Sequence, residues 1–401
     1  MNNNHTLKIG VYPLLLIYSL FVLWGFIWNL FNVLATFFQE SFELSNLQTS
    51  LGTSLSFLAF FLMSYPAKII INRFGTKNAI SLGALITAIG LAIFFPASIA
   101  KSYNIFLVGL FVLFSGVTIL QTVCNPYIGI LGDVKNRAAR INFAQGVGAI
   151  GAAITAPLGG WFMLELFEKD IFGGIKIFYL MISGFFILLA LLINFAPMPP
   201  NPTEVSKEET KVSMKAGGAF QHRHFMIGFI IMFVYMGAEA ILYQLMTPYF
   251  KEIGQIGNAE AVRFSAIIFY GLMVGRLLGA WTMTRIDPAR ILGYFAFIAA
   301  LLVFTSIVAG GRIGIYSITA IGFFVSIIFA SLFALATKDL GKLTNEASSF
   351  MIMAISGGFF IPLLYGFVAD SFSLRASLFV IAIPLLLTSG YGFLYKRIKT
   401  N

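Results

Sequence analysis

The sequence predicts an all-α membrane protein with twelve transmembrane helices arranged as two six-helix bundles. Three observations support this fold class: the composition, twelve apolar stretches of helical length, and one long polar interval in the middle. Of the 401 residues, 59% are hydrophobic and 10% are charged, whereas soluble domains carry about 25% charged residues. A soluble core could not bury so many apolar segments, each close to the roughly 20 residues that cross a bilayer.

Hydropathy gives twelve candidate spans, and their even number puts both ends of the chain on one side of the membrane. The spans lie at about residues 11–37, 47–71, 79–98, 103–132, 141–167, 174–197, 225–250, 262–284, 290–309, 312–337, 346–370 and 374–395. The polar interval 198–223 separates six spans from six, and its Pro, Glu and Lys content is typical of a linker. We therefore predict an N-terminal bundle at 1–197, a cytoplasmic linker at 198–223 and a C-terminal bundle at 224–401.

The basic residues indicate which side faces the cytoplasm. Of the 26 Lys and Arg residues, 19 fall on the side of the termini and seven on the opposite side, namely Lys101, Lys169, Lys176, Lys251, Arg263, Arg312 and Arg375. Cytoplasmic connections carry the excess of Lys and Arg. We therefore expect cytoplasmic N- and C-termini and a multi-pass protein of the cell inner membrane. Topology and anionic lipid explain the net charge of +10, so no nucleic-acid partner is expected.

Short internal similarities indicate two related halves. The segment RFGTKNAISLG (73–83) follows the second span and RIDPARILG (285–293) follows the eighth. In the same way, AIGAAITAPLGGW (149–161) in the fifth span resembles ISGGFFIPLLYGF (355–367) in the eleventh. Paired repeats are typical of transporters that bind substrate near the midplane and expose it alternately to each side.

Glu239 is the only carboxylate in the apolar stretch 225–250. A charged side chain at the centre of a membrane helix costs about 2.5–3.5 kcal/mol on insertion scales, so such a residue favours a substrate or ion pathway. The alternative is a neutral structural Glu, buried between helices. Tyr235 and Tyr243 lie four residues to either side, with Gln244 adjacent, and their hydroxyls could hydrogen-bond the carboxylate. Glu239 is thus the candidate proton-coupling group, with the other three as candidate substrate-binding residues.

Amide and indole side chains interrupt the apolar spans of the first half. They are Trp28, Asn29, Asn32, Gln121, Asn125 and Gln145. Amides both donate and accept hydrogen bonds, and an indole ring offers flat apolar surface, a combination that suits the hydroxyl edge and C–H face of a sugar. Hydrogen bonds that join helices are the alternative interpretation. Pro126 frees a backbone carbonyl about one turn earlier, which membrane helices tolerate only where it lines protein or a wet cavity.

Several segments, taken in order, are similar to the fucose/glucose-galactose branch of sugar symporters in the major facilitator superfamily. They are LFVLWGFIWNLFNVL (20–34), FFPAS (94–98), LVGLFVLFSGVTILQTVCNPYIGILG (107–132), ARINFAQ (139–145), YMGAE (235–239), GR (275–276) and ASSFMIMAISGG (347–358). The resemblance implies the major facilitator fold and symport of a hexose or deoxyhexose, such as fucose, glucose or galactose, with a proton or sodium. It also implies that Gln121, Asn125, Gln145 and Glu239 bind substrate.

The sequence departs from that branch at titratable positions. Asn32 stands where the branch usually has Asp, Gln121 where the fucose/proton members have Glu, Gly148 at an Asn, and Ile328 near a polar residue. An amide cannot bind and release a proton at physiological pH. Three mechanisms stay open: proton coupling through Glu239, sodium coupling through neutral oxygens with Glu239, and uncoupled diffusion. Family habit favours the first.

The loop after the second span resembles the superfamily's cytoplasmic latch of Gly, Asp, Arg, Gly and Lys. Arg73, Gly75 and Lys77 match the pattern, whereas Asn72 replaces the Asp. Losing this carboxylate predicts a weaker latch, unless Asp133 substitutes for it.

Two further functions remain open at this point. An exporter of drugs or siderophores would fit the Phe-rich interior, and a transport-dead sensor would fit the missing carboxylates. The sequence has one cysteine, Cys124, no metal-binding cluster and no nucleophile–base arrangement, so we expect neither an enzyme nor a metal or cofactor. The expected partners are a small-molecule sugar, a proton or sodium, and the lipid bilayer, with the protein as a monomer.

Overall fold

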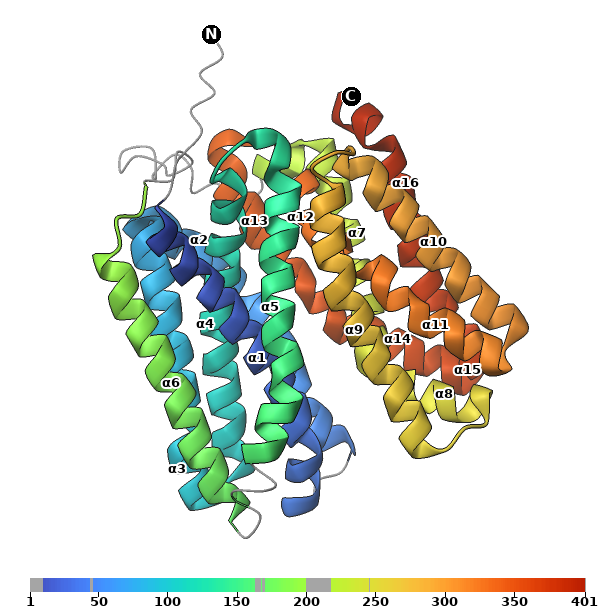
Figure 1. The fold of residues 1–401 in the computed structure, drawn as a ribbon, viewed down its shortest axis with the longest axis horizontal. Helices are drawn as coiled ribbons and strands as arrows, with labels where there is room; N and C mark the ends of the chain where they lie inside the picture. Colours follow the sequence, from blue (N-terminus) through green and yellow to red (C-terminus); the bar gives the residue numbers. More distant parts are fainter. Residues whose placement is uncertain are drawn as a thin grey trace. The chain divides into compact units, whose positions relative to one another are not determined.

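The structure, a computed structural model, describes residues 10–43, 46–162, 167, 170–199, 218–244 and 246–400. Within these ranges every regular element is a helix and none is a strand (Figure 1), so the all-α prediction is confirmed. The earlier helices are α1 (Val11–Ser41), α2 (Asn46–Ala92), α3 (Phe94–Ala100), α4 (Tyr103–Ile130), η1 (Val134–Asn136), α5 (Arg137–Gly160) and α6 (Ile171–Phe195). The later ones are η4 (Gly218–Gln221), α7 (Arg223–Gln244), α8 (Met246–Gly254), α9 (Asn258–Thr282), α10 (Pro288–Ala309), α11 (Gly311–Val325), α12 (Ile328–Ala336), η5 (Gly341–Leu343), α13 (Thr344–Met353), η6 (Ala354–Ser356), α14 (Gly357–Ser371), α15 (Leu374–Ser377) and α16 (Phe379–Thr400).

Ten segments of the described chain are long and apolar enough to cross a membrane. One of them, Ser54–Ala100, covers two predicted spans, 47–71 and 79–98. The Gly- and Ala-rich α5 is the predicted span that falls outside these ten. The helices therefore match the twelve predicted spans, with two of those spans joined in one long helical segment.

Gly75 turns the chain between the second and third spans. A straight helix of 47 residues such as α2 would extend about 70 Å at 1.5 Å per residue, far beyond the roughly 30 Å hydrocarbon layer. Gly75 interrupts it with φ 79° and ψ 166°, a backbone conformation that residues with a Cβ rarely adopt. The glycine of the predicted latch motif therefore has a definite structural role as the turn residue.

The chain divides into two compact units, each described here by itself. They comprise residues 1–132, 147–216 and 348–353, and residues 133–146, 217–347 and 354–401. The start of α5 thus belongs with the helices of the second half, and part of α13 belongs with those of the first. The predicted domain boundaries stay a prediction, since residues 200–217, most of the linker, lie outside the described chain.

Glycine brings the first and fifth spans of each half into close contact. A Cβ on Gly151 in α5 would clash with the carbonyl oxygen of Val22 in α1, and a Cβ on Gly357 at the start of α14 would clash with that of Phe233 in α7. These glycines occupy the same place in the similar segments 149–161 and 355–367. The repeated sequence therefore corresponds to repeated backbone packing, as expected for small residues between membrane helices.

Serine hydroxyls join the third and sixth spans of each half. Ser183 in α6 donates to the carbonyl of Ala88 in α2 at 2.8 Å, and Ser389 in α16 donates to that of Gly293 in α10 at 3.0 Å. The two halves thus share a second pairing of helices, which is further evidence of an internal duplication.

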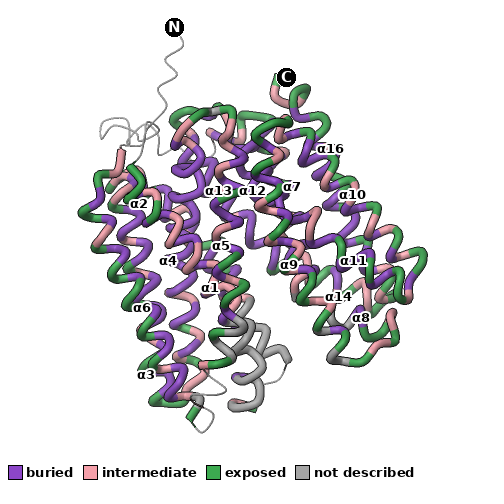
Figure 2. Tube along the Cα trace, viewed as in Figure 1, coloured by how far each residue is buried: buried purple, intermediate pink, exposed green. Residues whose placement is uncertain are grey.

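Burial separates core helices from those that face lipid. All of α12 and an unbroken run of α4 from Leu113 to Gly129 are buried (Figure 2). By contrast, α6 exposes many large apolar side chains, including Ile177, Leu180, Met181, Phe185, Leu188 and Leu191. An apolar surface of this kind is unfavourable in water and suits the hydrocarbon of a bilayer.

Candidate functional site

In the first unit, Trp28 and Asn29 of α1 take part in helix packing. Three aromatic rings lie with their centroids 5.4–6.1 Å from that of Trp28: Phe57, Phe60 and Phe114. The Asn29 amide donates to the carbonyl of Ala152 in α5 at 2.9 Å, which is an interhelical bond of the kind that the sequence left open. Asn32 lies in α1 as predicted, but its side chain lies outside the described ones.

Gln121 and Asn125 lie on successive turns of α4 and differ in their hydrogen bonding. Asn125 is fully buried, and its amide donates to the backbone carbonyl of Gln121 at 3.0 Å. The Gln121 side chain is 8% exposed and forms no hydrogen bond with any described residue. A nearly buried amide with open hydrogen-bonding capacity is unfavourable unless water or a ligand meets it. Gln121 is therefore the better substrate-binding candidate of the two.

In the second unit, Glu239 lies five residues before the end of α7 and is 4% exposed. The Tyr243 hydroxyl donates to its Oε1 at 2.8 Å, as the spacing of four predicts. Tyr235 also interacts with the carboxylate, and its hydroxyl donates to the carbonyl of Val325 at 3.0 Å. Gln244 ends α7, but its side chain lies outside the described ones.

The carbonyl of Val325 belongs to a break between two helices. α11 ends at Val325 and α12 begins at Ile328. Side chains from other helices donate to the carbonyls here: Tyr235 of α7 to Val325, and Arg276 of α9 to Ser326 at 3.2 Å from Nε. Such irregular backbone is tolerated within a membrane where protein groups satisfy it.

Arg276 is the residue of this site that the sequence analysis does not single out. It falls within the predicted span 262–284, and the structure places it inside α9, six residues before the helix ends at Thr282. Its Nη1 donates to the carbonyl of Gln145 in α5 at 3.4 Å, and its charge acts on the Glu239 carboxylate. A single Arg within the apolar run FYGLMVGRLLGAW was the available signal.

Gln145 lies in the part of α5 that packs within the second unit, and its side chain is 7% exposed. One turn earlier, the Asn142 amide donates to Ser331 Oγ of α12 at 3.2 Å. The amide side chains of α5 are therefore placed among second-half helices, close to the segment that carries Arg276.

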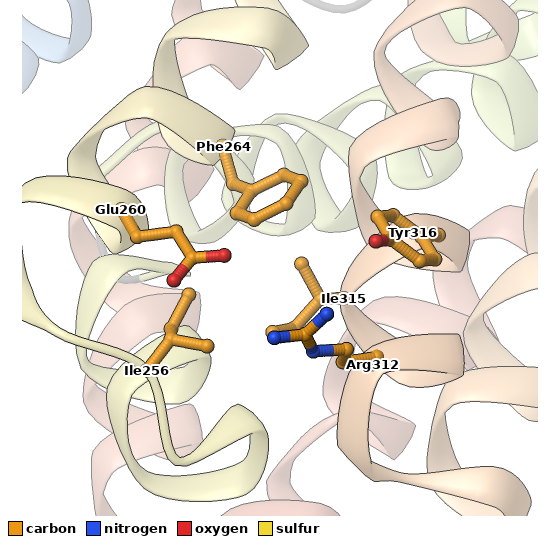
Figure 3. Close-up of a pocket in the computed structure, with 6 residues that line it drawn as sticks. All are labelled: Ile256, Glu260, Phe264, Arg312, Ile315 and Tyr316. Atoms are coloured by element: carbon orange, nitrogen blue, oxygen red, sulfur yellow. The ribbon is translucent and has the colours of Figure 1, made fainter.

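A small recess lies elsewhere in the second unit, between the start of α9 and the start of α11. Glu260 and Arg312 face each other across it, together with Ile256, Phe264, Ile315 and Tyr316 (Figure 3). Its empty volume of about 160 Å³ is below the roughly 300–1,000 Å³ of typical small-molecule pockets. Glu260 is separated from Arg276 by 16 residues, or about 24 Å of helix. The recess is therefore separate from the Glu239 cluster.

The predicted latch residues surround the turn between the second and third spans. Arg73 is exposed and stacks 5.5 Å from the ring centroid of Phe74, and Lys77 lies two residues after Gly75. Asp133, the proposed substitute acid, accepts a hydrogen bond from a backbone N–H two residues further on, at 3.0 Å. Its carboxylate thus stabilises its own turn, and the latch itself stays a prediction.

Across the described residues, no group of three or more His, Cys, Asp or Glu side chains could hold a metal ion. Cys124 is fully buried in α4.

The model of the Major Facilitator Superfamily matches residues 16–361. A glucose/galactose transporter of Brucella abortus is 33% identical over 388 residues, which cover 94% of this chain and 92% of that protein. The L-fucose-proton symporter of Escherichia coli is 29% identical over 383 residues, with coverages of 90% and 87%.

A crystal structure of the Escherichia coli fucose:proton symporter, FucP, superposes with a TM-score of 0.87 at 26% sequence identity, covering 96% of this chain and 98% of that chain. The likeness therefore extends over nearly the whole length of both chains, as the ordered sequence motifs predict.

Proposed function

This chain belongs to the Major Facilitator Superfamily, and we propose from that membership that it is a secondary active transporter carrying a hexose or deoxyhexose together with a proton. The relatives that support this proposal are named as glucose/galactose and fucose transporters and match the chain over nine-tenths of its length. They are transporters and not enzymes. Alternating access is the mechanism of such folds, because paired helical repeats can rock about a central site.

The burial and hydrogen bonding of Glu239 are the observations that support coupling to protons. Glu239 is a carboxylic acid buried in α7, and the hydroxyl of Tyr243 donates to its Oε1. The proton would bind the other oxygen, Oε2, while that hydrogen bond is kept. The amides of Asn32 and Gln121 cannot take this role, because amides do not titrate at physiological pH.

For the sugar, we propose the polar residues around these helices as ligands. Gln121 in α4 is the best supported of the first-half residues, because its side-chain amide is nearly buried and forms no hydrogen bond with any described residue. The other proposed ligands are Trp28, Asn29, Asn32, Asn125, Gln145, Tyr235, Glu239, Tyr243 and Gln244. Amides and hydroxyls would pair with the sugar hydroxyls, and the indole ring would lie against its C–H face.

Uptake into proteoliposomes tests both parts of the proposal. Labelled fucose, glucose and galactose are offered with an imposed inward proton gradient, with a sodium gradient, and with none. We expect at least one sugar to accumulate under the proton gradient. If no sugar moves under any condition, the sugar proposal fails; accumulation with sodium alone, or equilibration without accumulation, contradicts proton coupling.

Glu239→Gln isolates the coupling group, because the amide has nearly the same shape and cannot titrate. We expect this variant to exchange sugar by counterflow but to lose accumulation under a proton gradient. The matched control is Glu260→Gln, which neutralises an exposed carboxylate at the recess between α9 and α11 and should accumulate sugar as the natural protein does. Undiminished accumulation by Glu239→Gln would exclude Glu239 as the coupling group.

We further propose that the protein is a monomer in the inner membrane with both termini in the cytoplasm. The asymmetry of Lys and Arg supports the orientation. Exposed apolar side chains on α6 support direct contact with lipid.

A further inference from the structure

Arg276 is a cation within a membrane-spanning helix and has no function assigned by the mechanism above. Within the described chain, its guanidinium hydrogen-bonds to two neutral groups, the carbonyls of Ser326 and Gln145, at 3.2 and 3.4 Å. Carbonyl dipoles orient a guanidinium but do not neutralise it. A positive charge in a low-dielectric region needs a compensating negative charge.

Close packing of α9 against α11 fixes the place of Arg276. A Cβ on the preceding residue, Gly275, would clash with Ser326 Oγ and with the carbonyl of Phe323. A Cβ on Gly322 would likewise clash with the carbonyl of Ile268. The backbones of the two helices therefore touch, and the Arg276 side chain emerges beside the break between α11 and α12.

Glu239 is the carboxylate nearest to this position by the contacts of its helix. It lies one turn after Tyr235 on α7, and the Tyr235 hydroxyl donates to the carbonyl of Val325, next to the Ser326 carbonyl that accepts from Arg276. The groups that act on its carboxylate are Arg276 of α9 and the hydroxyls of Tyr235 and Tyr243, on its own helix. α12, which packs against α7, has no ionisable residue. In α14, Tyr365 interacts with Ser377 and with groups of α8 instead. α16 also packs against α7, but its Tyr391 hydroxyl donates to the carbonyl of His224 at the start of α7, 15 residues before Glu239, and the Lys and Arg residues of α16 lie beyond Tyr391. Among the described residues, Arg276 is therefore the cation whose charge acts on Glu239.

We infer that Arg276 is a positioning residue for proton coupling, which compensates Glu239 when that carboxylate is ionised and is left uncompensated when it is protonated. This inference rests on the proposed function. In the step, Glu239–COO⁻ takes one proton from the accessible solution and becomes Glu239–COOH, so the pair changes from net neutral to a charge of +1. The charge change acts on a guanidinium that is bonded to α5 and to the α11–α12 break.

The hydrogen bond from Arg276 to α5 connects the change of charge at Glu239 to the position of that helix. The start of α5 is held within the second unit by further polar contacts: Arg137 donates to Thr337 Oγ1 at 2.8 Å, and Asn142 donates to Ser331 Oγ at 3.2 Å. Arg276 adds a bond to the same helix at Gln145. Protonation of Glu239 thus alters the electrostatic environment of one of the contacts that hold α5.

The pH profile of counterflow tests this inference with Arg276→Gln and Arg276→Lys. Removing an opposite charge favours the protonated carboxyl, so the midpoint of the profile should move to higher pH in Arg276→Gln, by about one unit or more. Arg276→Lys keeps the charge and should shift the midpoint less. Arg285→Gln is the matched control, since Arg285 lies beyond α9 and stacks on Trp281 at 4.2 Å. An unchanged midpoint in Arg276→Gln would overturn the inference.

A double-mutant cycle on thermal stability gives a measurement that does not depend on transport. Glu239→Gln and Arg276→Gln should each lower the melting temperature, because the first leaves the half-buried Arg276 and the second the buried Glu239 without its opposite charge. The double variant should lose less than the sum of the two losses. Additive losses, with sugar uptake intact in the natural protein, would overturn this inference alone. Absence of any uptake by the natural protein would instead contradict the proposed function.

Discussion

Tyr243 is the residue that hydrogen-bonds directly to Glu239, and its hydroxyl should tune the proton affinity of the site. A hydrogen bond to a charged group contributes roughly 1.5–3 kcal/mol, and one unit of pH corresponds to about 1.4 kcal/mol. The bond from Tyr243 to Oε1 at 2.8 Å favours the ionised carboxylate. Proton release from Glu239 at working pH therefore depends on the Tyr243 hydroxyl as well as on the positive charge of Arg276.

We predict that Tyr243→Phe moves the pH midpoint of sugar counterflow upward by about one unit, because the carboxylate loses a donor while the ring packing is kept. Tyr270→Phe is the control, since Tyr270 in α9 is 59% exposed. Equal midpoints in the two variants would show that the Tyr243 hydroxyl does not stabilise the ionised form.

At the scale of the element, backbone contacts between helices depend on the absence of a single carbon atom. Gly151 and Gly357 hold the first and fifth spans of each half together, and neither position has room for a Cβ. Gly184 in α6 is different, since nothing lies within 4 Å of the place where its Cβ would be. The chain thus offers helical glycines with opposite packing requirements.

We predict that Gly151→Ala and Gly357→Ala each destabilise the purified protein by about 1–3 kcal/mol, the usual cost of overpacking a close contact. Gly184→Ala should leave the melting temperature unchanged or raise it, since Ala is the better helix former by about 1 kcal/mol. Melting temperatures of the three variants in detergent check this. A Gly151→Ala protein as stable as Gly184→Ala would mean that α1 and α5 are not in backbone contact.

For the whole molecule, the orientation in the membrane follows from charges spread over the connections. Lys135, in η1 and two residues before α5, belongs to the side rich in Lys and Arg, whereas Lys101, after α3, belongs to the other side. Both residues are exposed. The only native cysteine, Cys124, is buried, so it should not react with reagents that label surface thiols.

We predict that a membrane-impermeant thiol reagent labels Lys101→Cys in intact cells but labels Lys135→Cys only after the membrane is permeabilised. The natural protein, with Cys124 buried, is the unlabelled control. Labelling of Lys135→Cys and not Lys101→Cys in intact cells would place the termini on the outer side.

Most of the fold could be predicted because hydropathy and internal repeats are read from residues that follow one another along the chain. The hydrogen bond from Tyr243 to Glu239 was predictable for the same reason, since a spacing of four places two residues on one helix face. Contacts between helices carry no such signal. Asn29 pairs with the carbonyl of Ala152, and nothing in the sequence distinguishes this bond from a contact with a sugar.

The partners of Arg276 and the break after Val325 could not be predicted for a related physical reason. The predicted span 262–284 contains Arg276, but the carbonyls that its guanidinium reaches depend on how α9 packs against other helices. The break lies within the apolar run IGFFVSIIFA, which contains no proline. Its carbonyls are satisfied by Tyr235 and Arg276, and these are tertiary contacts.

The satisfied carbonyls have a mechanical consequence for α11 and α12. In a continuous helix, bending strains backbone hydrogen bonds, and kinks form where a side chain enters that ladder. The carbonyls of Val325 and Ser326 already have side-chain donors, so a bend there does not leave them without partners. A bend between α11 and α12 would therefore cost little in lost hydrogen bonds, and it would lie where the side chains of Tyr235 and Arg276 reach the backbone.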